Sequence, residues 1–111
     1  MTDRELLELA AKAAGIKIEH DDVSGFVWFE SKYSGVIWNP LHHDGDALRL
    51  AVKLRIDFYE GVGDGPEAWA GYCLPAFTKQ KFACEPHNGD PYAATRRAIV
   101  RAAAEIGKEL K

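Results

Sequence analysis

Apolar residues recur at helical spacing near the start of the chain. The stripe follows the spacing i, i+3, i+4, i+7 and consists of Leu6, Leu9, Ala10 and Ala13. Thr2 stands three residues before Glu5, a capping-box arrangement that satisfies backbone N–H groups at a helix start. Gly15 suits the left-handed position that closes a helix. These signals predict a helix over residues 3–14.

The apolar period then changes to two, which is typical of β-strands. Apolar and charged residues alternate over residues 16–19 and predict a short strand before a polar turn at residues 21–25. Two runs of β-branched and aromatic residues follow, at 26–29 and 36–38. The length and composition of the segment between these runs predict that they pair as a hairpin.

A second helix and three more strands are predicted in the middle of the chain. The helical stripe consists of Ala47, Leu50, Ala51 and Leu54. Asp44 or Asp46 is a suitable N-cap for this helix. The predicted strands cover residues 56–59, 68–74 and 81–85. A glycine-rich turn at residues 61–66 separates the first two strands, and Pro75 stops the second.

The last segment carries a strong helix start. Asp90 is an N-cap residue, and Pro91 at the first helical position lacks an N–H that would have no partner there. The apolar face consists of Thr95, Ile99, Ala102, Ala103, Ile106 and Leu110. The opposite face consists of Arg96, Arg97, Arg101, Glu105 and Lys108. The small residues of the apolar face predict close packing against a sheet or another helix.

The order of elements predicts one domain over residues 1–111, because no linker, repeat or low-complexity segment divides the chain. The predicted fold class is α+β, with about five to six mainly antiparallel strands and N-terminal, middle and long C-terminal helices. Periodicity alone leaves open whether the helices share one face of a sheet or lie on both faces.

Composition narrows the class of protein. A hydrophobic content of 47% and a charged content of 28% are ordinary for a globular domain. The net charge of −3 argues against nonspecific binding to nucleic acid. The polar N-terminus and the shortness of every apolar run predict a cytoplasmic protein with no membrane partner. Cys73 and Cys84 are expected to be reduced thiols, although their spacing across a hairpin also allows a disulfide.

Several segments together resemble a known group of proteins. They are the sequence Trp38-Asn39-Pro40, the helix at residues 46–54, an aromatic strand with Trp69, and residues 94–103. The chain resembles small phage-encoded proteins of unknown function, the phage ABA-sandwich domains and the NinX-like proteins. The resemblance implies a single-domain α-β-α sandwich with helices on both faces of the sheet, encoded among phage accessory genes. That family has no established catalytic residues, so the resemblance implies no mechanism.

The densest polar cluster follows the second aromatic run. It consists of Asn39, His42, His43, Asp44 and Asp46. Two imidazoles and two carboxylates within a few residues are the groups that a small metal-dependent hydrolase uses. Adjacent histidines on a loop tend to point apart, however, and both aspartates are natural helix caps. The favoured interpretation is a loop and helix start that binds no metal, and no cofactor is predicted.

Two other groups of residues have a chemical and a structural interpretation. Cys84 and His87 have the Cys-x-x-His spacing of half a zinc site, but the remaining ligands must come from distant segments. Arg96, Arg97 and Arg101 are the residues that a nucleic-acid-binding domain would use. The acidic start of their helix argues against that partner.

The aromatic hairpin is the strongest indication of an interaction surface. Alternation places Trp28 on the opposite side of its strand from both neighbours, so one side of the hairpin carries large aromatics outside a two-layer core. Trp28 and Trp38, with the polar cluster from Asn39 to Asp46, form the predicted surface. We therefore expect a noncatalytic phage or prophage accessory protein in the host cytoplasm. Its predicted partner is a host or phage protein, and a second copy of the chain is an open alternative.

Overall fold

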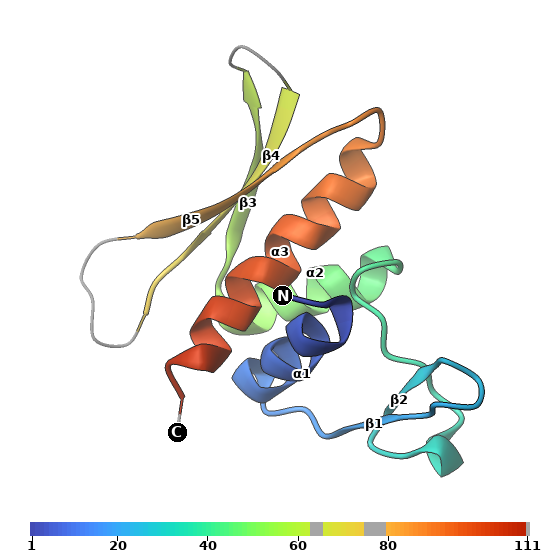
Figure 1. Cartoon of the computed structure of the whole chain (residues 1–111). Coiled ribbons are helices and arrows are strands. Elements are labelled where there is room, and N and C mark those ends of the chain that lie inside the picture. Colours follow the sequence, from blue (N-terminus) through green and yellow to red (C-terminus); the bar gives the residue numbers. More distant parts are fainter. Residues whose placement is uncertain (63–65, 75–79, 111) are drawn as a thin grey trace.

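The computed structural model of the chain describes residues 1–62, 66–74 and 80–110 (Figure 1). The elements in these ranges are α1 (Asp3–Ala14), β1 (Ile18–His20), β2 (Val27–Phe29), the 3-10 turn η1 (Lys32–Ser34), α2 (Asp44–Leu54), β3 (Asp57–Val62), β4 (Pro66–Tyr72), β5 (Lys81–Pro86) and α3 (Pro91–Lys108). The predicted α+β class is confirmed, with antiparallel strands and N-terminal, middle and C-terminal helices.

The predicted first helix and its start signal are confirmed. The Thr2 side chain accepts a hydrogen bond from the backbone N–H of Glu5 at 3.1 Å, and Gly15 closes the helix with φ 68°. The buried face of α1 consists of Leu6, Leu7, Ala10, Ala11 and Ala14. This face packs against α3, and so residues near the two ends of the chain share one core.

The two-stranded sheet pairs β1 with β2, with Glu19 opposite Trp28. The hairpin predicted between residues 26–29 and 36–38 is present in a shorter form. Its ladder is one antiparallel bridge, between Trp28 and Ile37. The backbone leaves the extended region directly after β2, where Glu30 has φ 66°, and η1 follows. This departure limits the pairing of the second run.

The second helix begins one residue after His43, whose side chain makes no capping hydrogen bond. The prediction that Asp44 or Asp46 is the N-cap is therefore wrong. Both aspartates lie inside the first turn, where negative charge favours a helix start, and both side chains bind other segments. Tertiary contacts thus replace the local cap.

The second sheet has the strand order β3-β4-β5 and is antiparallel throughout. Its two faces differ. The inner face packs small side chains, Ala68, Ala70 and Ala83, against α3. The outer face carries Tyr59, Trp69 and Phe82, and no helix of the described ranges covers it (Figure 1).

Helix α3 lies between this sheet and the pair α1 and α2 (Figure 1). Its buried residues are Ala94, Ala98, Ile99, Val100, Ala102, Ala103, Ala104, Ile106 and Gly107. Ile99, Ala102, Ala103 and Ile106 of the predicted face are in this set, whereas Thr95 and Leu110 are only half-buried. The other buried residues are added because α3 is covered from two sides. The alanines allow both neighbours to approach the helix axis closely.

The layering answers the question that periodicity left open. All three described helices lie on the inner side of the three-stranded sheet, and the two-stranded sheet lies beside α1 and α2 (Figure 1). The resemblance implied helices on both faces of a sheet, whereas here the helices lie between two sheets. None of the described helices combines the length and the apolar composition that crossing a bilayer requires.

Candidate functional site

The polar cluster predicted between Asn39 and Asp46 does not converge on one point. Asp46 is 9% exposed, and its carboxylate accepts the backbone N–H of Asn39 at 2.9 Å and Arg49 Nη2 at 2.7 Å. His43 Nδ1 lies 3.5 Å from the same carboxylate. His42 Nδ1 instead faces the side-chain oxygen of Asn39 at 3.2 Å. Asp46 therefore fastens the preceding loop to the start of α2.

Asp44 is bound to α3 instead. Its carboxylate binds Arg96 of α3 at 2.7 Å, and Arg96 also donates to the carbonyl oxygen of Leu41 at 2.9 Å. The two aspartates of the cluster thus serve different segments. In the ranges that the structure describes, no three His, Cys, Asp or Glu side chains gather closely enough to hold a metal ion. The geometry gives the hydrolase alternative no shared centre.

The two predicted tryptophans differ in exposure. Trp38 is 5% exposed and belongs to the core, so its ring is not available to a partner. Trp28 is half-buried, and its ring meets Phe26 edge to face at 5.7 Å. The exposed aromatic side chains of this region are instead Phe26 and Tyr33.

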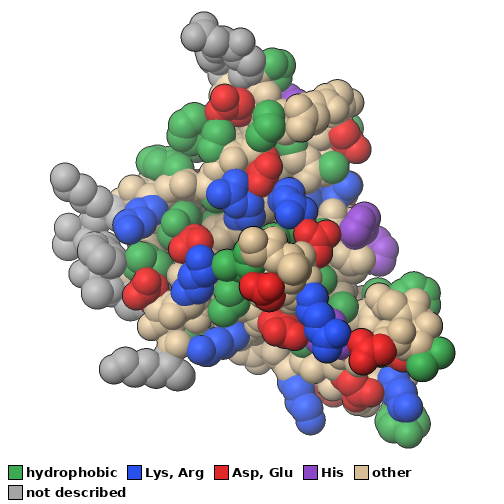
Figure 2. Space-filling model, viewed as in Figure 1, with side chains coloured by type: hydrophobic (Ala, Val, Ile, Leu, Met, Phe, Trp, Pro, Cys, Tyr) green, Lys and Arg blue, Asp and Glu red, His purple; other side chains and the backbone are tan. Residues whose placement is uncertain are grey.

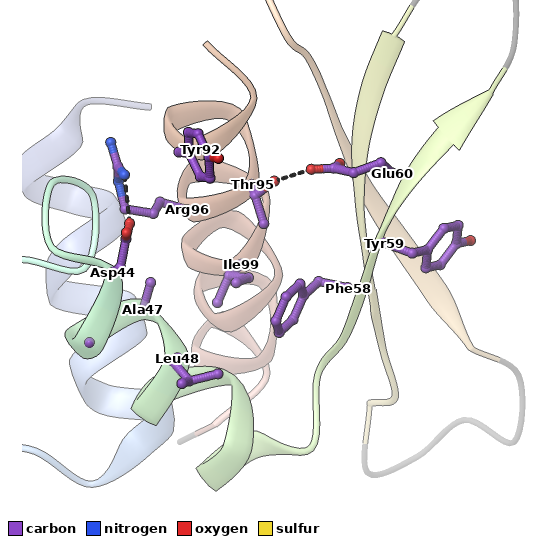
Figure 3. A pocket seen from close by; sticks show the side chains of 11 residues that line it. Asp44, Ala47, Leu48, Phe58, Tyr59, Glu60, Tyr92, Thr95, Arg96 and Ile99 are labelled. Atoms are coloured by element: carbon purple, nitrogen blue, oxygen red, sulfur yellow. Dashed lines mark hydrogen bonds and ion pairs between the residues drawn. The ribbon is translucent and has the colours of Figure 1, made fainter.

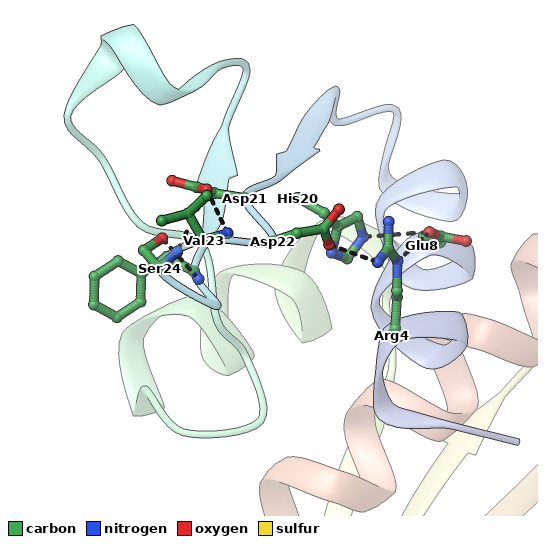
Figure 4. Close-up of polar contacts among 8 residues, drawn as sticks. Arg4, Glu8, His20, Asp21, Asp22, Val23 and Ser24 are labelled. Atoms are coloured by element: carbon green, nitrogen blue, oxygen red, sulfur yellow. Dashed lines mark hydrogen bonds and ion pairs between the residues drawn. The ribbon is translucent and has the colours of Figure 1, made fainter.

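The turn that leads into β2 is held by contacts within the chain. Hydrogen bonds from the Ser24 side chain and from the backbone of Val23 lower the pKa of Asp21. Nearby, Arg4 of α1 binds Asp22 at 3.1 Å and Glu8 at 3.4 Å, and His20 lies 3.3 Å from Glu8 (Figure 4). These side chains join α1 to the two-stranded sheet. The arrangement accounts for the acidic turn without a ligand.

The arginines of α3 are bound to acidic side chains of the same chain. Arg97 binds Asp3 at 3.0 Å, and Arg101 binds Glu85 at 2.8 Å. Figure 2 shows basic and acidic side chains intermixed on the face that it presents. Arginines that are already paired offer little net positive charge to phosphates. The structure therefore gives the nucleic-acid alternative little support.

Both cysteines are free thiols. Cys84 Sγ donates a hydrogen bond to Glu67 Oε2 at 2.7 Å. That hydrogen bond, together with desolvation, raises the pKa of the Cys84 thiol to about 11. His87 Nε2 lies 3.2 Å from Glu60, so the two residues of the predicted zinc half-site bind different carboxylates.

A hollow lies elsewhere, between α2, β3 and the first half of α3. It has a volume of about 560 Å³. Its apolar wall consists of Ala47, Leu48, Phe58, Tyr92 and Ile99. Figure 3 shows Phe58 directed from β3 towards Ile99, while the neighbouring Tyr59 points to the other side of the strand. We call this hollow the α2–α3 groove.

Three large apolar side chains of the groove remain open to solvent. Tyr92 is 71% exposed, Leu48 51% and Phe58 43%. Single exposed apolar residues are normal, but a concave group of them marks a binding surface. One local feature of the sequence indicates exposed apolar surface on α2. Leu48 and Val52 are four residues apart and lie outside the buried stripe of that helix.

The rim of the groove is polar, and the chain satisfies its polar groups internally. Asp44 binds Arg96, and Thr95 donates to Glu60 at 2.6 Å (Figure 3). Glu60 also faces His87. What the groove offers is an apolar surface with fixed polar edges, which suits recognition.

Comparison of the chain with protein-family models, with curated proteins and with solved structures finds no match.

Proposed function

We propose that this domain is noncatalytic and acts by binding another protein, whose apolar side chains enter the α2–α3 groove. The observation that carries the proposal is the concave group of Leu48, Phe58 and Tyr92, all exposed, beside a rim that is paired within the chain. The occupant that fits is a short amphipathic segment, with its apolar side in the groove and its polar side towards the rim.

The exposed area sets the strength of this contact. Complete burial of a large apolar side chain stabilises by about 1.5–3 kcal/mol, and between 43% and 71% of each of the three side chains is still open. Covering all three would contribute about 3–4 kcal/mol before the cost of association. Removal of one of them should therefore weaken a complex about tenfold, which corresponds to about 1.4 kcal/mol.

The proposal keeps the protein-binding role expected from the sequence but moves the surface. Trp38 is in the core, and Asn39 and Asp46 hydrogen-bond to each other. We also propose, from the resemblance alone, that the domain is a phage or prophage accessory protein and that the partner is a host or phage protein. Phage genes on both sides of the gene would support the origin, and a position among housekeeping genes would contradict it.

The binding role can be tested with a photo-crosslinking aromatic amino acid placed at position 92 or at position 33. Tyr33 is a matched control because it is 87% exposed and does not line the groove. We expect a distinct protein to crosslink from position 92 and not from position 33. Equal crosslinking from both positions, or none from position 92, would contradict the proposal.

The captured protein is then titrated against purified variants. Leu48→Glu should raise its Kd at least tenfold because a charge replaces an apolar wall. Val23→Glu is the control, since Val23 is 99% exposed in a turn outside the groove. Retention of wild-type affinity by a folded Leu48→Glu variant would remove the groove from the binding surface.

A further inference from the structure

The outer face of the three-stranded sheet carries an aromatic cluster that belongs to no core. Strand pairing places Tyr59 beside Trp69, and Trp69 beside Cys84. The rings of Tyr59 and Trp69 are nearly parallel, with 6.3 Å between centroids, and Phe82 meets both edge to face. Tyr59 is 48% exposed and Phe82 46% exposed. The three strands together present aromatic surface to solvent.

A glycine on the neighbouring strand allows the indole of Trp69 to lie down on the sheet. A Cβ added at Gly61 would stand 2.5 Å from Trp69 Nε1 and 2.9 Å from Cδ1. Any other residue at position 61 would push the ring away from β3. The indole therefore lies along the sheet, nearly parallel to the ring of Tyr59.

Two carboxylates flank the aromatic cluster on the same face. Asp57 accepts a hydrogen bond from the amide of Gln80 at 3.3 Å, and Glu67 accepts one from the Cys84 thiol at 2.7 Å. Both donors are neutral, so these hydrogen bonds do not neutralise the negative charges. The acidic residues that face the helices differ, since Glu85 and Asp44 bind arginines.

We propose that this outer face binds an arginine-bearing segment of a partner protein, which stacks guanidinium groups on Tyr59, Trp69 and Phe82 and pairs with Asp57 and Glu67. A planar, weakly hydrated guanidinium both stacks on aromatic rings and bonds carboxylates through two N–H groups. A second copy of this chain fits less well, because the same two carboxylates would meet their own kind across a two-fold axis.

Strand geometry also gives the spacing of the arginines. Asp57 lies opposite Gly71, and Glu67 lies opposite Gly61, so the carboxylates stand two residue pairs on either side of Tyr59 and Trp69. Four residues along a strand span about 13 Å. An extended segment with arginines at positions i and i+4, which point to the same side, matches this separation.

The test uses a fluorescently labelled extended peptide with two arginines four positions apart, titrated at physiological salt. A control peptide carries citrulline at both positions, which keeps the shape of the side chain and removes its charge. We expect saturable binding of the arginine peptide and at least tenfold weaker binding of the citrulline peptide. Equal affinity of the two peptides, or no binding of the arginine peptide, would overturn the proposal.

Variants then assign the binding to this face. Asp57→Asn with Glu67→Gln keeps both hydrogen-bond acceptors and should weaken binding at least tenfold. Glu30→Gln with Glu109→Gln removes the same charge from exposed positions off this face and should change affinity less than twofold. Tyr59→Ala tests the stacking on a part-exposed side chain. An equal loss in both double variants would show general attraction of a basic peptide and would reject the site.

Two further measurements distinguish binding at this face from binding at the α2–α3 groove and from self-association. Leu48→Glu, in the α2–α3 groove, should leave peptide binding unchanged, so this inference and the proposed function can fail separately. Sedimentation of the free protein at several concentrations tests whether a second copy of the chain occupies the outer face. If the protein forms a dimer and Tyr59→Ala dissociates it, the outer face binds a second copy of the chain. That result would overturn the proposal of an arginine-bearing partner.

Discussion

Replacement of Gly107 by alanine is the sharpest test of how α1 and α3 are packed. Gly107 is buried in α3, where the helix crosses α1. A Cβ at this position would stand 2.9 Å from the carbonyl carbon of Leu9 and closer still to its oxygen. The obstacle is the backbone of a helix, so no side-chain rotation relieves it. The two helices have to move apart.

The expected magnitude combines two opposing effects. Alanine stabilises a helix interior by about 0.5–1 kcal/mol relative to glycine. Overpacking of a close contact costs about 1–3 kcal/mol, and here it also loosens the neighbouring alanine contacts of α1. We expect Gly107→Ala to lower the free energy of unfolding by about 2 kcal/mol. At about 4 °C per kcal/mol, this lowers Tm by about 8 °C.

Gly45 provides a matched control in another helix. A Cβ at Gly45 meets only the end of the flexible Arg49 side chain, at 3.3 Å. Gly45→Ala should therefore stabilise the protein by about 0.5 kcal/mol. Urea denaturation of both variants gives the comparison, provided that the m-value is unchanged. If Gly107→Ala is as stable as the wild type or more stable, the backbones of α1 and α3 do not lie too close together for a Cβ at position 107.

Three other predictions follow from single contacts. The pKa of about 11 leaves Cys84 almost fully protonated at pH 8. Glu67→Gln should lower that pKa and so raise the fraction of thiolate, although a thiolate of lower pKa is a weaker nucleophile. The net effect should be alkylation by iodoacetamide that is up to about tenfold faster. An unchanged rate of alkylation would contradict the role of the hydrogen bond. Asp46→Ala leaves the N–H of Asn39 without its acceptor and should lower the free energy of unfolding by about 1–3 kcal/mol. Asp46→Asn keeps an acceptor oxygen and should lose much less. Chemical denaturation of both variants measures the difference. Thr2→Ala removes the cap of α1 and should cost about 1 kcal/mol, and a change below about 0.2 kcal/mol would show that the end is frayed.

Much of the fold could be predicted because its signals are local. Thr2 and Gly15 bound the first helix, and Asp90 with Pro91 starts the last one, as the sequence predicted. The start of α2 could not be predicted from local signals. Asp44 and Asp46 have the residue type of a cap, but partners far along the chain or in the preceding loop take their carboxylates.

The candidate surfaces were harder to predict than the helices. Leu48, Phe58 and Tyr92 come from three different elements, so each reads in the sequence as an isolated exposed apolar residue. The outer face depends on strand register, since a slip of one residue would turn Tyr59 inward. Trp38 illustrates the opposite error, because an aromatic at the end of a strand run can as easily fill the core.

The central position of α3 has a consequence for when the domain can fold during its synthesis. Residues 3–14 leave the ribosome well before residues 91–108, the helix on which α1 packs. At about 5–20 residues per second, α1 waits on the order of 5–20 s for its partner. A helix of 12 residues is marginal alone, and the sheet lacks its cover during the same interval. Assembly is therefore late and concerted, and nascent chains stalled before residue 91 should be sensitive to protease throughout the part of this domain that has left the ribosome.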